Sequence, residues 1–370
     1  MLDRSTNETS SLLARFQAER AAAYEVLRRL EPLSDGQRRL LVTNLPAARC
    51  RSVCEMLVEK SREERHQARE TLRYAELAVL VSQSLTGDYA DEPRARAWAE
   101  LGNARRIGAD LVGADEALSE AERLYGRGGA DPLFQAELYS LRGSLAQYQR
   151  RFDLAIKVLG RAYRLFDRHD DLEGTARTLM TLALTHVYAG DPEPGLPYVE
   201  RALALAASSS DDRLKLFAFH NLVLVLTEAG RLEEAAWHAH KVRPLIDAIG
   251  RRLDRLRFDW LTTRIGAELG VLRPAARAFD RLRGCYAEEG RPFEAALVSL
   301  DLAVIYARLN DMTRLRTLAS ESEAIFRALG VGRECLAALA LLAHCTAAEA
   351  LQQLEELRRM VEGTRSGRST

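Results

Sequence analysis

Residues 139–162 read YSLRGSLAQYQRRFDLAIKVLGRA. Helix-forming residues dominate this stretch, and its apolar residues recur at intervals of three and four, as they do on one face of an α-helix. A polar stretch at Arg150-Arg151 separates two such runs, so we expect two helices joined by a tight turn. Gly143 and Ala155 place one small residue in each helix, which allows the two helices of this hairpin to approach closely.

The same pattern recurs about every forty residues along the chain. The small or compact residue at the centre of each first helix recurs at intervals of 41, 40, 40, 40 and 40 residues: Gly102, Gly143, Ala183, Val223, Thr263 and Ala303. A second series, early in each second helix, has the same intervals: Ala114, Ala155, Gly195, Ala235, Ala275 and Leu315. The predicted turns lie between them: Ala109-Asp110, Arg150-Arg151, Gly190-Asp191, Gly230-Arg231, Gly270-Val271 and Asn310-Asp311. One hairpin cannot bury its apolar face alone, so the six units must stack.

The repeat resembles the tetratricopeptide repeat (TPR) in its first four units, of which the third has Gly190-Asp191 with Ala202 and the fourth has Gly230-Arg-Leu-Glu-Glu-Ala235. The first is Trp98-x-x-Leu101-Gly102 followed by Ala114-x-x-x-Leu118-x-x-Ala121; the second is Tyr139-x-x-x-Gly143 followed by Phe152-x-x-Ala155-x-x-x-Leu159-x-x-Ala162. Later units depart from the pattern, with Thr263 in place of the glycine and Leu315 in place of the early alanine. The period exceeds the usual repeat of roughly 34 residues and is similar to that of bacterial regulatory TPR proteins. The whole chain also resembles uncharacterised bacterial TPR proteins.

This resemblance covers roughly residues 92–330 and implies an all-α fold: a TPR-type α-solenoid in which helical hairpins form a right-handed superhelix. We expect a helical N-terminal leader or cap at residues 1–91, six hairpins at 92–330, a C-terminal capping hairpin at 331–362 and a disordered tail at 363–370. Ser34-x-x-Gln37 and Thr346-x-x-Glu349 predict capping boxes that open helices within the two flanking parts.

Composition and charge restrict the possible function. Hydrophobic residues make up 47% of the chain, and 53 basic residues balance 53 acidic ones, which disfavours a protein that coats nucleic acid or an anionic membrane. No apolar run approaches the roughly 18 residues of a membrane span, and the N-terminus lacks the pattern of a secretory signal. The five cysteines include no CxxC pair. We therefore expect a cytoplasmic protein that acts without a cofactor, and without direct contact to nucleic acid or a membrane.

No motif predicts a catalytic or metal site. His169-Asp170 falls in a predicted loop, where both residues suit a solvated turn better than a metal-dependent hydrolase. Cys50 and Cys54 share a helix face and His66 follows, but no fourth ligand is visible. Small buried side chains are therefore the preferred interpretation of the two cysteines.

A helix-turn-helix is an alternative for two short helices near the N-terminus, which carry Arg38, Arg39, Arg49 and Arg51. Their junction, residues 42–46, lacks the usual glycine turn, and acidic residues follow directly. A solvated helical face is therefore preferred to a DNA-binding surface.

Partner binding is expected on one face of the first helices. Residues at positions −6, −3, +1 and +4 from the central small residue share this face, and in the TPR resemblance it lines the concave groove. The candidate partner-binding residues are Arg96, Asn103, Arg106, Arg177, Met180, Leu184, Phe217, His220, Leu224, Arg257, Trp260 and Arg264. Our hypothesis is that the apolar centre buries an amphipathic or extended partner segment, whose acidic groups pair with the arginines Arg106, Arg177, Arg257 and Arg264.

Two alternatives concern the same face. A clamp for a terminal carboxylate, as in chaperone-binding TPR proteins, is disfavoured because Ala99, Leu141 and Thr181 stand where polar groups are needed. The array could instead close, so that the groove residues pack against its own N-terminal helices.

The favoured function is a non-enzymatic scaffold or adaptor that binds a protein or peptide partner in the groove. The alternative is a signal-responsive TPR regulator, controlled by a peptide or other ligand and acting on a transcription factor or effector enzyme. The layout of a helical leader followed by long hairpins resembles that of such regulators.

Overall fold

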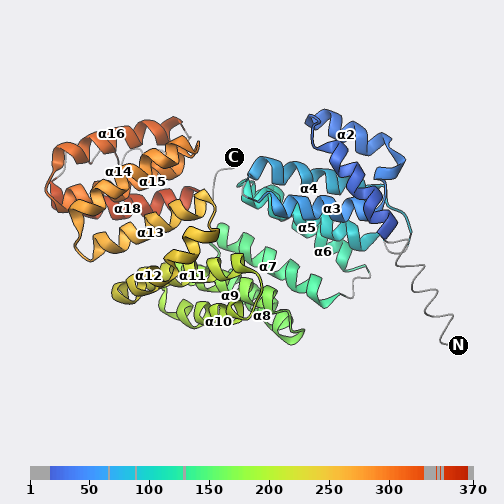
Figure 1. Ribbon diagram of the computed structural model, residues 1–370, viewed down its shortest axis with the longest axis horizontal. Helices are drawn as coiled ribbons and strands as arrows, with labels where there is room; N and C mark the ends of the chain where they lie inside the picture. The colour runs from blue at the N-terminus through green and yellow to red at the C-terminus, as the bar shows by residue number, and fades with distance from the viewer. Residues whose placement is uncertain are drawn as a thin grey trace. The chain divides into compact units, whose positions relative to one another are not determined.

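The computed structural model describes residues 17–65, 67–87, 90–127, 131–328, 339, 342 and 346–365. Within these residues every regular element is a helix and no strand occurs (Figure 1). The predicted all-α class is therefore confirmed. The chain divides into two compact units, one reaching His169 and the other beginning at Asp170.

The first unit begins with a helical segment at residues 17–30. Its further elements are α2 (Asp35–Asn44), η1 (Pro46–Ala48), α3 (Arg51–Glu63), α4 (Ala68–Gln83), α5 (Asp91–Ile107), α6 (Leu111–Tyr125), α7 (Pro132–Tyr148) and α8 (Phe152–Arg168). The second unit contains α9 (Leu172–Ala189), η2 (Glu193–Gly195), α10 (Leu196–Ala207), α11 (Asp212–Glu228), α12 (Leu232–Ile249), α13 (Arg252–Glu268), α14 (Leu272–Glu288), α15 (Pro292–Arg308), α16 (Met312–Ala328) and α18 (Ala347–Arg365).

The helices follow the predicted period. The six first helices α5, α7, α9, α11, α13 and α15 begin at residues 91, 132, 172, 212, 252 and 292, which reproduces the intervals of 41, 40, 40, 40 and 40. Within a unit, each first helix packs on its own second helix, and both pack on the first helix of the next hairpin. This is the stacking that hairpins with an unburied apolar face require.

The turns inside the hairpins share one geometry. Their first residue has a positive φ in all six: Ala109, Arg150, Gly190, Gly230, Gly270 and Asn310, at 66°, 58°, 88°, 73°, 89° and 58°. In the first turn, Asp110 N donates to Arg105 O at 2.9 Å and Ala109 N donates to Arg106 O at 3.0 Å, and the other five repeat this pair of bonds. This is the Schellman motif, which satisfies the last carbonyls of a helix. Three of these residues are not glycine; asparagine tolerates a positive φ, whereas Ala109 and Arg150 hold a strained conformation.

The central glycines allow the close approach inside the hairpins. A Cβ atom on Gly143 would lie 2.4 Å from Leu159 Cγ, and one on Gly102 would lie 2.7 Å from Leu118 Cγ. Leu118 and Leu159 are at most 1% exposed. Burial of each leucine side chain contributes about 2 kcal/mol, and this packing requires the space that glycine leaves.

A helical hairpin, α3–α4, precedes the six predicted hairpins. α3 begins 40 residues before α5, contacts both α4 and α5, and has Ser61 in the position that Gly102 holds in α5. Ser61 is fully buried. The hairpin α3–α4 thus has the neighbour relations of the six predicted hairpins, although it lies in the segment assigned to the leader. The division at residue 91 stays a prediction.

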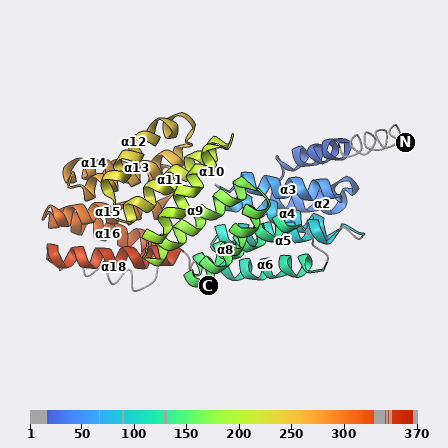
Figure 2. The ribbon, with the colours of Figure 1, turned by 90° about the horizontal axis from the view of Figure 1, so that it is seen from below.

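The C-terminal helix α18 lies beside α15 in the second unit (Figures 1 and 2). Its predicted capping box is present, because Thr346 N donates to Glu349 Oε2 at 2.7 Å and Glu349 N donates to Thr346 Oγ1 at 3.4 Å. The helix continues to Arg365, past the expected start of the tail at 363. Residues 331–338, 340, 341 and 343–345 of the predicted capping hairpin, and the last five residues of the tail, lie outside the described residues.

Candidate functional site: the stripe face of the first helices

The candidate residues fall on two surfaces, one in each unit. We call the first stripe the residues at positions −6, −3, +1 and +4 of α3, α5 and α7, and the second stripe the same positions of α9, α11 and α13. The first stripe contains Arg96, Asn103 and Arg106, all on α5. The second stripe contains the other nine candidates, three on each helix: Arg177, Met180 and Leu184; Phe217, His220 and Leu224; Arg257, Trp260 and Arg264.

The second stripe has an apolar centre that is only partly covered. Met180 is 5% exposed, whereas Leu184, Phe217 and Leu224 are half-buried. Phe217 and Leu224 pack at the edge of the core cluster formed by α9 to α13. Apolar side chains that remain partly exposed on adjacent helices form a surface on which a further apolar group can be buried.

His220 lies in the middle of this apolar centre. Its ring lies 6.2 Å from the ring of Phe258, between centroids. Burial, assisted by the nearby charge of Arg257 and opposed by Asp254, lowers the pKa of His220 to about 4. His220 is therefore a neutral imidazole at neutral pH, and it adds no cation to the second stripe.

Most arginines of the second stripe already have an acidic partner in the chain. Arg177 pairs with Glu173 at 2.6 Å and with Asp211 at 3.3 Å. Arg264 pairs with Glu228 at 2.9 Å. The hypothesis that these arginines pair with acidic groups of a partner stays a prediction, and such a partner would have to compete with carboxylates of the chain itself.

Trp260 connects the second stripe to the C-terminal helix. Its indole Nε1 donates to Asp301 Oδ2 at 2.6 Å, and Arg358 of α18 pairs with Asp301 Oδ1 at 3.2 Å. Asp301 shares a face of α15 with Leu297, four residues earlier, and both are buried. α18 therefore covers this face of α15, so the stripe face of the last hairpin is already packed against a helix of the chain. This helix is C-terminal, not one of the N-terminal helices considered above.

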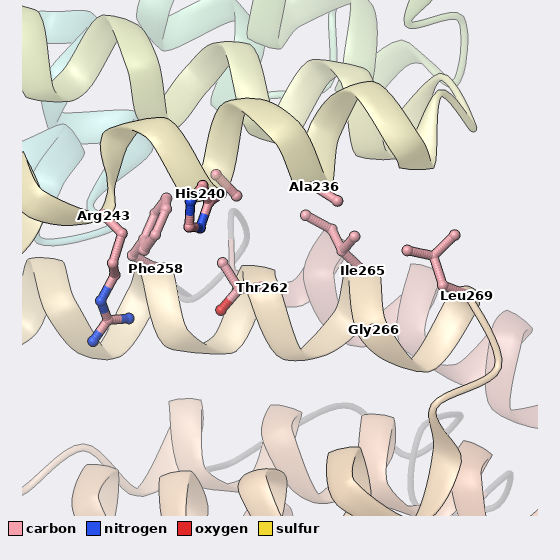
Figure 3. Close-up of a pocket in the computed structure, with 9 residues that line it drawn as sticks. Ala236, His240, Arg243, Phe258, Thr262, Ile265, Gly266 and Leu269 are labelled. Atoms are coloured by element: carbon pink, nitrogen blue, oxygen red, sulfur yellow. The ribbon is translucent and has the colours of Figure 1, made fainter.

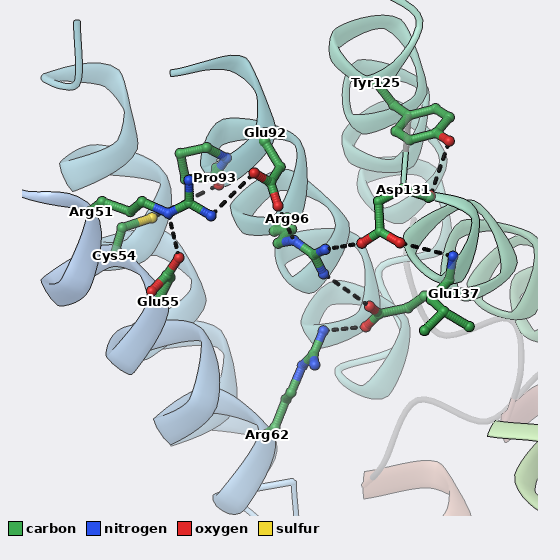
Figure 4. A network of polar contacts seen from close by, with 11 residues as sticks. Arg51, Cys54, Glu55, Arg62, Glu92, Pro93, Arg96, Tyr125, Asp131 and Glu137 are labelled. Atoms are coloured by element: carbon green, nitrogen blue, oxygen red, sulfur yellow. Dashed lines mark hydrogen bonds and ion pairs between the residues drawn. The ribbon is translucent and has the colours of Figure 1, made fainter. Parts of the chain in front are cut away.

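The first stripe is a chain of ion pairs (Figure 4). Arg62 of α3 contacts Glu137 of α7 and lies 3.3 Å from Glu100 of α5. Arg96 pairs with Asp131 at 2.5 Å and lies 3.8 Å from Glu137. Arg62 thus reaches from α3 past α5 to α7, so these ion pairs link three successive first helices of the stack.

Two aspartates at the N-termini of helices each cap their own helix and pair with an arginine of the preceding hairpin. Asp131 is the N-cap of α7, accepts a hydrogen bond from Leu133 N at 2.9 Å and also pairs with Arg96 of α5. Asp211, the N-cap of α11, accepts one from Arg213 N at 2.8 Å and pairs with Arg177 of α9. Each carboxylate caps a helix and also links two successive hairpins.

Two clefts lie away from the stripes. The larger, about 460 Å³, opens between α12 and α13 and is lined by Ala236, Phe258, Ile265 and Leu269, with His240 and Arg243 toward one end (Figure 3). A cleft of about 240 Å³ in the first unit is lined by Tyr139 and three arginines of α8, Arg161, Arg164 and Arg168. Neither cleft was predicted.

The sites disfavoured from the sequence have structural roles. Burial raises the pKa of the Cys54 thiol to about 12, and its Sγ donates to Ala78 O at 3.5 Å, so Cys54 is a neutral buried thiol. His66 lies outside the described residues. Across the described segments, no group of three His, Cys, Asp or Glu residues is placed to hold a metal ion. None of the helices in the described part of the chain combines the length and the apolarity that a membrane crossing needs.

The arginines of the helix-turn-helix alternative also contact protein groups. Arg38 Nε donates to Leu30 O at 3.0 Å, and Arg39 pairs with Glu76 at 2.6 Å. Arg51 pairs with Glu55 at 2.6 Å, and Arg49 donates to a backbone carbonyl. These guanidinium groups stabilise the first unit.

Sequence reasoning missed the part of the first stripe that α3 contributes. Ser61 precedes Gly102 by 41 residues, so the period that defines the other hairpins places Arg62 and Arg65 at positions +1 and +4. The signal was present in the spacing. It was overlooked because α3 and α4 lack the Gly or Asn turn of most later hairpins.

Comparison with known proteins agrees with this architecture. Residues 134–208, from α7 to α10, match the family model described as tetratricopeptide repeat. This part of the chain matches tetratricopeptide repeats. The resemblance stated from the sequence and the TPR-type fold are thus confirmed. A comparison with curated proteins finds no match.

Solved structures of helical-repeat proteins are similar to this chain. Aspartyl phosphate phosphatase F from Bacillus subtilis has a TM-score of 0.59 at 14% identity, over 82% of this chain and 79% of that one. A Rap protein complexed with competence and sporulation factor has a TM-score of 0.56 at 13% identity, over 95% and 99%. The quorum sensor NprR from B. thuringiensis, in its apo form, has a TM-score of 0.54 at 14% identity, over 91% and 97%. At such identities the likeness shows the fold.

Proposed function

We propose that the chain is a non-enzymatic, cytoplasmic adaptor that binds a segment of a protein or peptide partner on the second stripe. The observation that carries this proposal is the partly exposed apolar centre formed by Leu184, Phe217 and Leu224. A partner that covers these side chains removes apolar area from water, which contributes about 25 cal/mol for each Å² buried. The ion pairs of Arg177 and Arg264 border this area and give it a polar rim, as at other protein interfaces.

The C-terminal helix shows what kind of segment suits such a face. α18 buries Ala350, Leu354, Leu357 and Val361, a spacing of four, three and four that forms one apolar side. This side packs with residues of α15 in one core cluster. We therefore expect the partner segment to be an amphipathic helix with a similar apolar side.

The test compares two sets of variants. Leu184→Glu and Leu224→Glu place charges in the apolar centre, whereas Val271→Glu places one at a turn residue that is already 50% exposed. A partner is first isolated from a native lysate with the wild-type protein and identified by mass spectrometry. Its affinity for each purified variant is then measured. We expect at least a tenfold loss for the two stripe variants and no change for Val271→Glu; equal affinity for all of them contradicts the proposal.

A second candidate function is a regulator controlled by a signal peptide. The similarity to a Rap protein complexed with competence and sporulation factor, and to the quorum sensor NprR, supports it. The two functions differ in the response to a short ligand, because a regulator must have different affinities for the ligand in two conformations. A short peptide that changes the hydrodynamic radius of the protein supports the regulator, whereas an adaptor responds only to its protein partner.

A further inference from the structure

The cleft of about 240 Å³ in the first unit is lined by arginines that have no acidic partner. Arg161, Arg164 and Arg168 line it from α8, and Tyr139 lines it from α7. All three arginines are exposed. Within the described residues, no ion pair joins any of them to a carboxylate. We call Tyr139, Arg161, Arg164, Leu165 and Arg168 the arginine cleft.

The three arginines share one face of α8. Their spacing of three and four residues places them one above the other along the helix. A rise of 1.5 Å per residue puts the Cα atoms of Arg161 and Arg168 about 10 Å apart, so their long side chains can reach one small ligand. The guanidinium of Arg161 also lies 6.0 Å from the centre of the Tyr139 ring.

This concentration of positive charge is a feature of α8 and not of the repeat. The equivalent positions in the other second helices contain Glu120, Arg123 and Arg127 in α6; Arg201, Ala204 and Ser208 in α10; Lys241, Pro244 and Ala248 in α12; Arg281, Gly284 and Glu288 in α14; and Glu321, Ala324 and Ala328 in α16. Of these six helices, only α8 has a basic residue at all three positions. In α6, Glu120 stands in place of Arg161 and pairs with Arg123 at 2.5 Å.

The electrostatics of the arginine cleft favour an anion. The chain as a whole has as many acidic as basic residues, so the excess of positive charge is local. Like charges around one cleft repel each other, and their combined field attracts an anion that enters between them. An anion bound there supplies the acceptors that the chain does not.

We propose that the arginine cleft binds the phosphate group of a small phosphate ester, whose organic part lies against Tyr139 and Leu165. A phosphate group carries a charge of about −1.5 to −2 at pH 7 and has three acceptor oxygens, which matches three guanidinium groups. A carboxylate has one charge and two oxygens, so it would neutralise this cleft less completely. Tyr139 and Leu165 are only partly buried and offer apolar surface beside the arginines.

This site is separate from the two stripes. Tyr139 stands at position −4 of α7, and the other four residues belong to the second helix α8. The proposal therefore does not rest on partner binding to the second stripe.

The experiment measures the binding of phenyl phosphate by isothermal titration calorimetry, in a buffer without phosphate and at constant ionic strength. We expect saturable binding to one site. We expect Arg161→Gln, Arg164→Gln and Arg168→Gln each to weaken this binding by about tenfold, the size of a lost charge-assisted hydrogen bond. A wild-type protein that shows no saturable binding refutes the proposal.

Three further probes test the chemistry of the ligand. Benzoate has the same ring with a carboxylate, and we expect it to bind about tenfold more weakly than phenyl phosphate; equal affinity contradicts the assignment to phosphate. Inorganic phosphate lacks the ring and should also bind more weakly, whereas equal affinity contradicts the contact with Tyr139 and Leu165. A phosphoserine peptide that binds more tightly than phenyl phosphate makes the ligand a partner protein and overturns the assignment to a small molecule.

A matched variant separates the arginine cleft from diffuse charge. Arg151→Gln removes an exposed arginine at the start of α8, outside the cleft, and is expected to leave the affinity unchanged. An equal loss of affinity in this variant and in Arg164→Gln attributes the binding to the overall charge of α8 and overturns the proposal.

The melting temperature tests the same reasoning. Phenyl phosphate should raise it in the wild-type protein by binding the folded state, and should raise it less in Arg164→Gln. Without ligand, Arg164→Gln removes no ion pair, so we expect an unchanged or higher melting temperature. A marked decrease shows that Arg164 is structural and contradicts the proposal.

Discussion

The hairpin α7–α8 offers two glycines whose replacement by alanine has opposite expected effects. In Gly143→Ala the new Cβ lies 2.4 Å from Leu159 Cγ, 2.7 Å from Leu159 Cδ2 and 3.3 Å from Leu159 N. In Gly160→Ala the nearest atom is the end of the Arg164 side chain, at 3.6 Å, which is ordinary contact. Both glycines lie within helices of the same hairpin, so the comparison isolates the effect of the contact with Leu159.

The magnitudes follow from two contributions. Replacing a glycine by alanine inside a helix stabilises it by about 1 kcal/mol, and this gain applies at both positions. At Gly143 the neighbouring leucine must move by more than an ångström to restore a normal contact of about 3.5–4 Å. Overpacking of this kind costs about 1–3 kcal/mol. We therefore expect Gly160→Ala to stabilise the protein by about 1 kcal/mol and Gly143→Ala to destabilise it by up to about 2 kcal/mol.

Urea unfolding followed by circular dichroism measures both effects, with the slope of the transition as a check that the unfolded state is unchanged. The double variant Gly143→Ala with Leu159→Ala adds a further test, since removing the leucine side chain removes the clash. We expect the two substitutions together to cost less than the sum of the single ones, by about 1 kcal/mol or more. Additive effects, or a Gly143→Ala protein as stable as Gly160→Ala, refute the close approach of the two helices.

Three further predictions concern a turn, a histidine and the C-terminal helix. Ala109→Gly relieves a residue with a φ of 66° and should stabilise the protein by about 1 kcal/mol, whereas Gly230→Ala in the equivalent turn should destabilise it by about as much, both measured by urea unfolding. The pKa of His220 is about 4 in the folded protein against 6.5 for the free group, so protons bind the unfolded chain first as the pH falls. The free energy of unfolding should therefore fall by about 2 kcal/mol between about pH 7 and pH 5. His220→Gln should lose this part of the pH dependence, measured by the melting temperature. Arg358→Met leaves the buried Asp301 carboxylate without its cation and should lower the free energy of unfolding by about 1–3 kcal/mol. We expect faster amide hydrogen exchange in α18 of this variant. Unchanged exchange shows that this ion pair does not hold the helix.

Much of the fold was predictable because hairpin packing restricts the residue type at positions that recur with a fixed period. Only a small residue fits at positions such as 102 and 143, and a turn that needs a positive φ selects glycine or asparagine at 190, 230, 270 and 310. These two requirements recur at the same interval and fix the helix boundaries. At α3–α4 the pattern is weaker and no hairpin was expected there, because serine replaces the central glycine and the turn contains no glycine.

The candidate site was harder to predict, because helix periodicity gives the face of a residue but not its partners. The position of Arg177 on its stripe follows from the spacing, whereas its pairing with Asp211 depends on how the next hairpin packs. The neutral state of His220 likewise depends on neighbours from other helices. Coverage of α15 by α18 depends on a contact between distant parts of the chain, which no local pattern encodes.

The double role of Asp131 and Asp211 limits how far the hairpins of this protein can be exchanged. Each of these carboxylates belongs to one hairpin and its arginine to the previous one, so a cut between α6 and α7 or between α10 and α11 separates one pair. A hairpin transplanted into another array would carry only one residue of each ion pair, and its new neighbours would have to supply the other. Engineering that shuffles these modules must therefore move arginine and aspartate together across the junction.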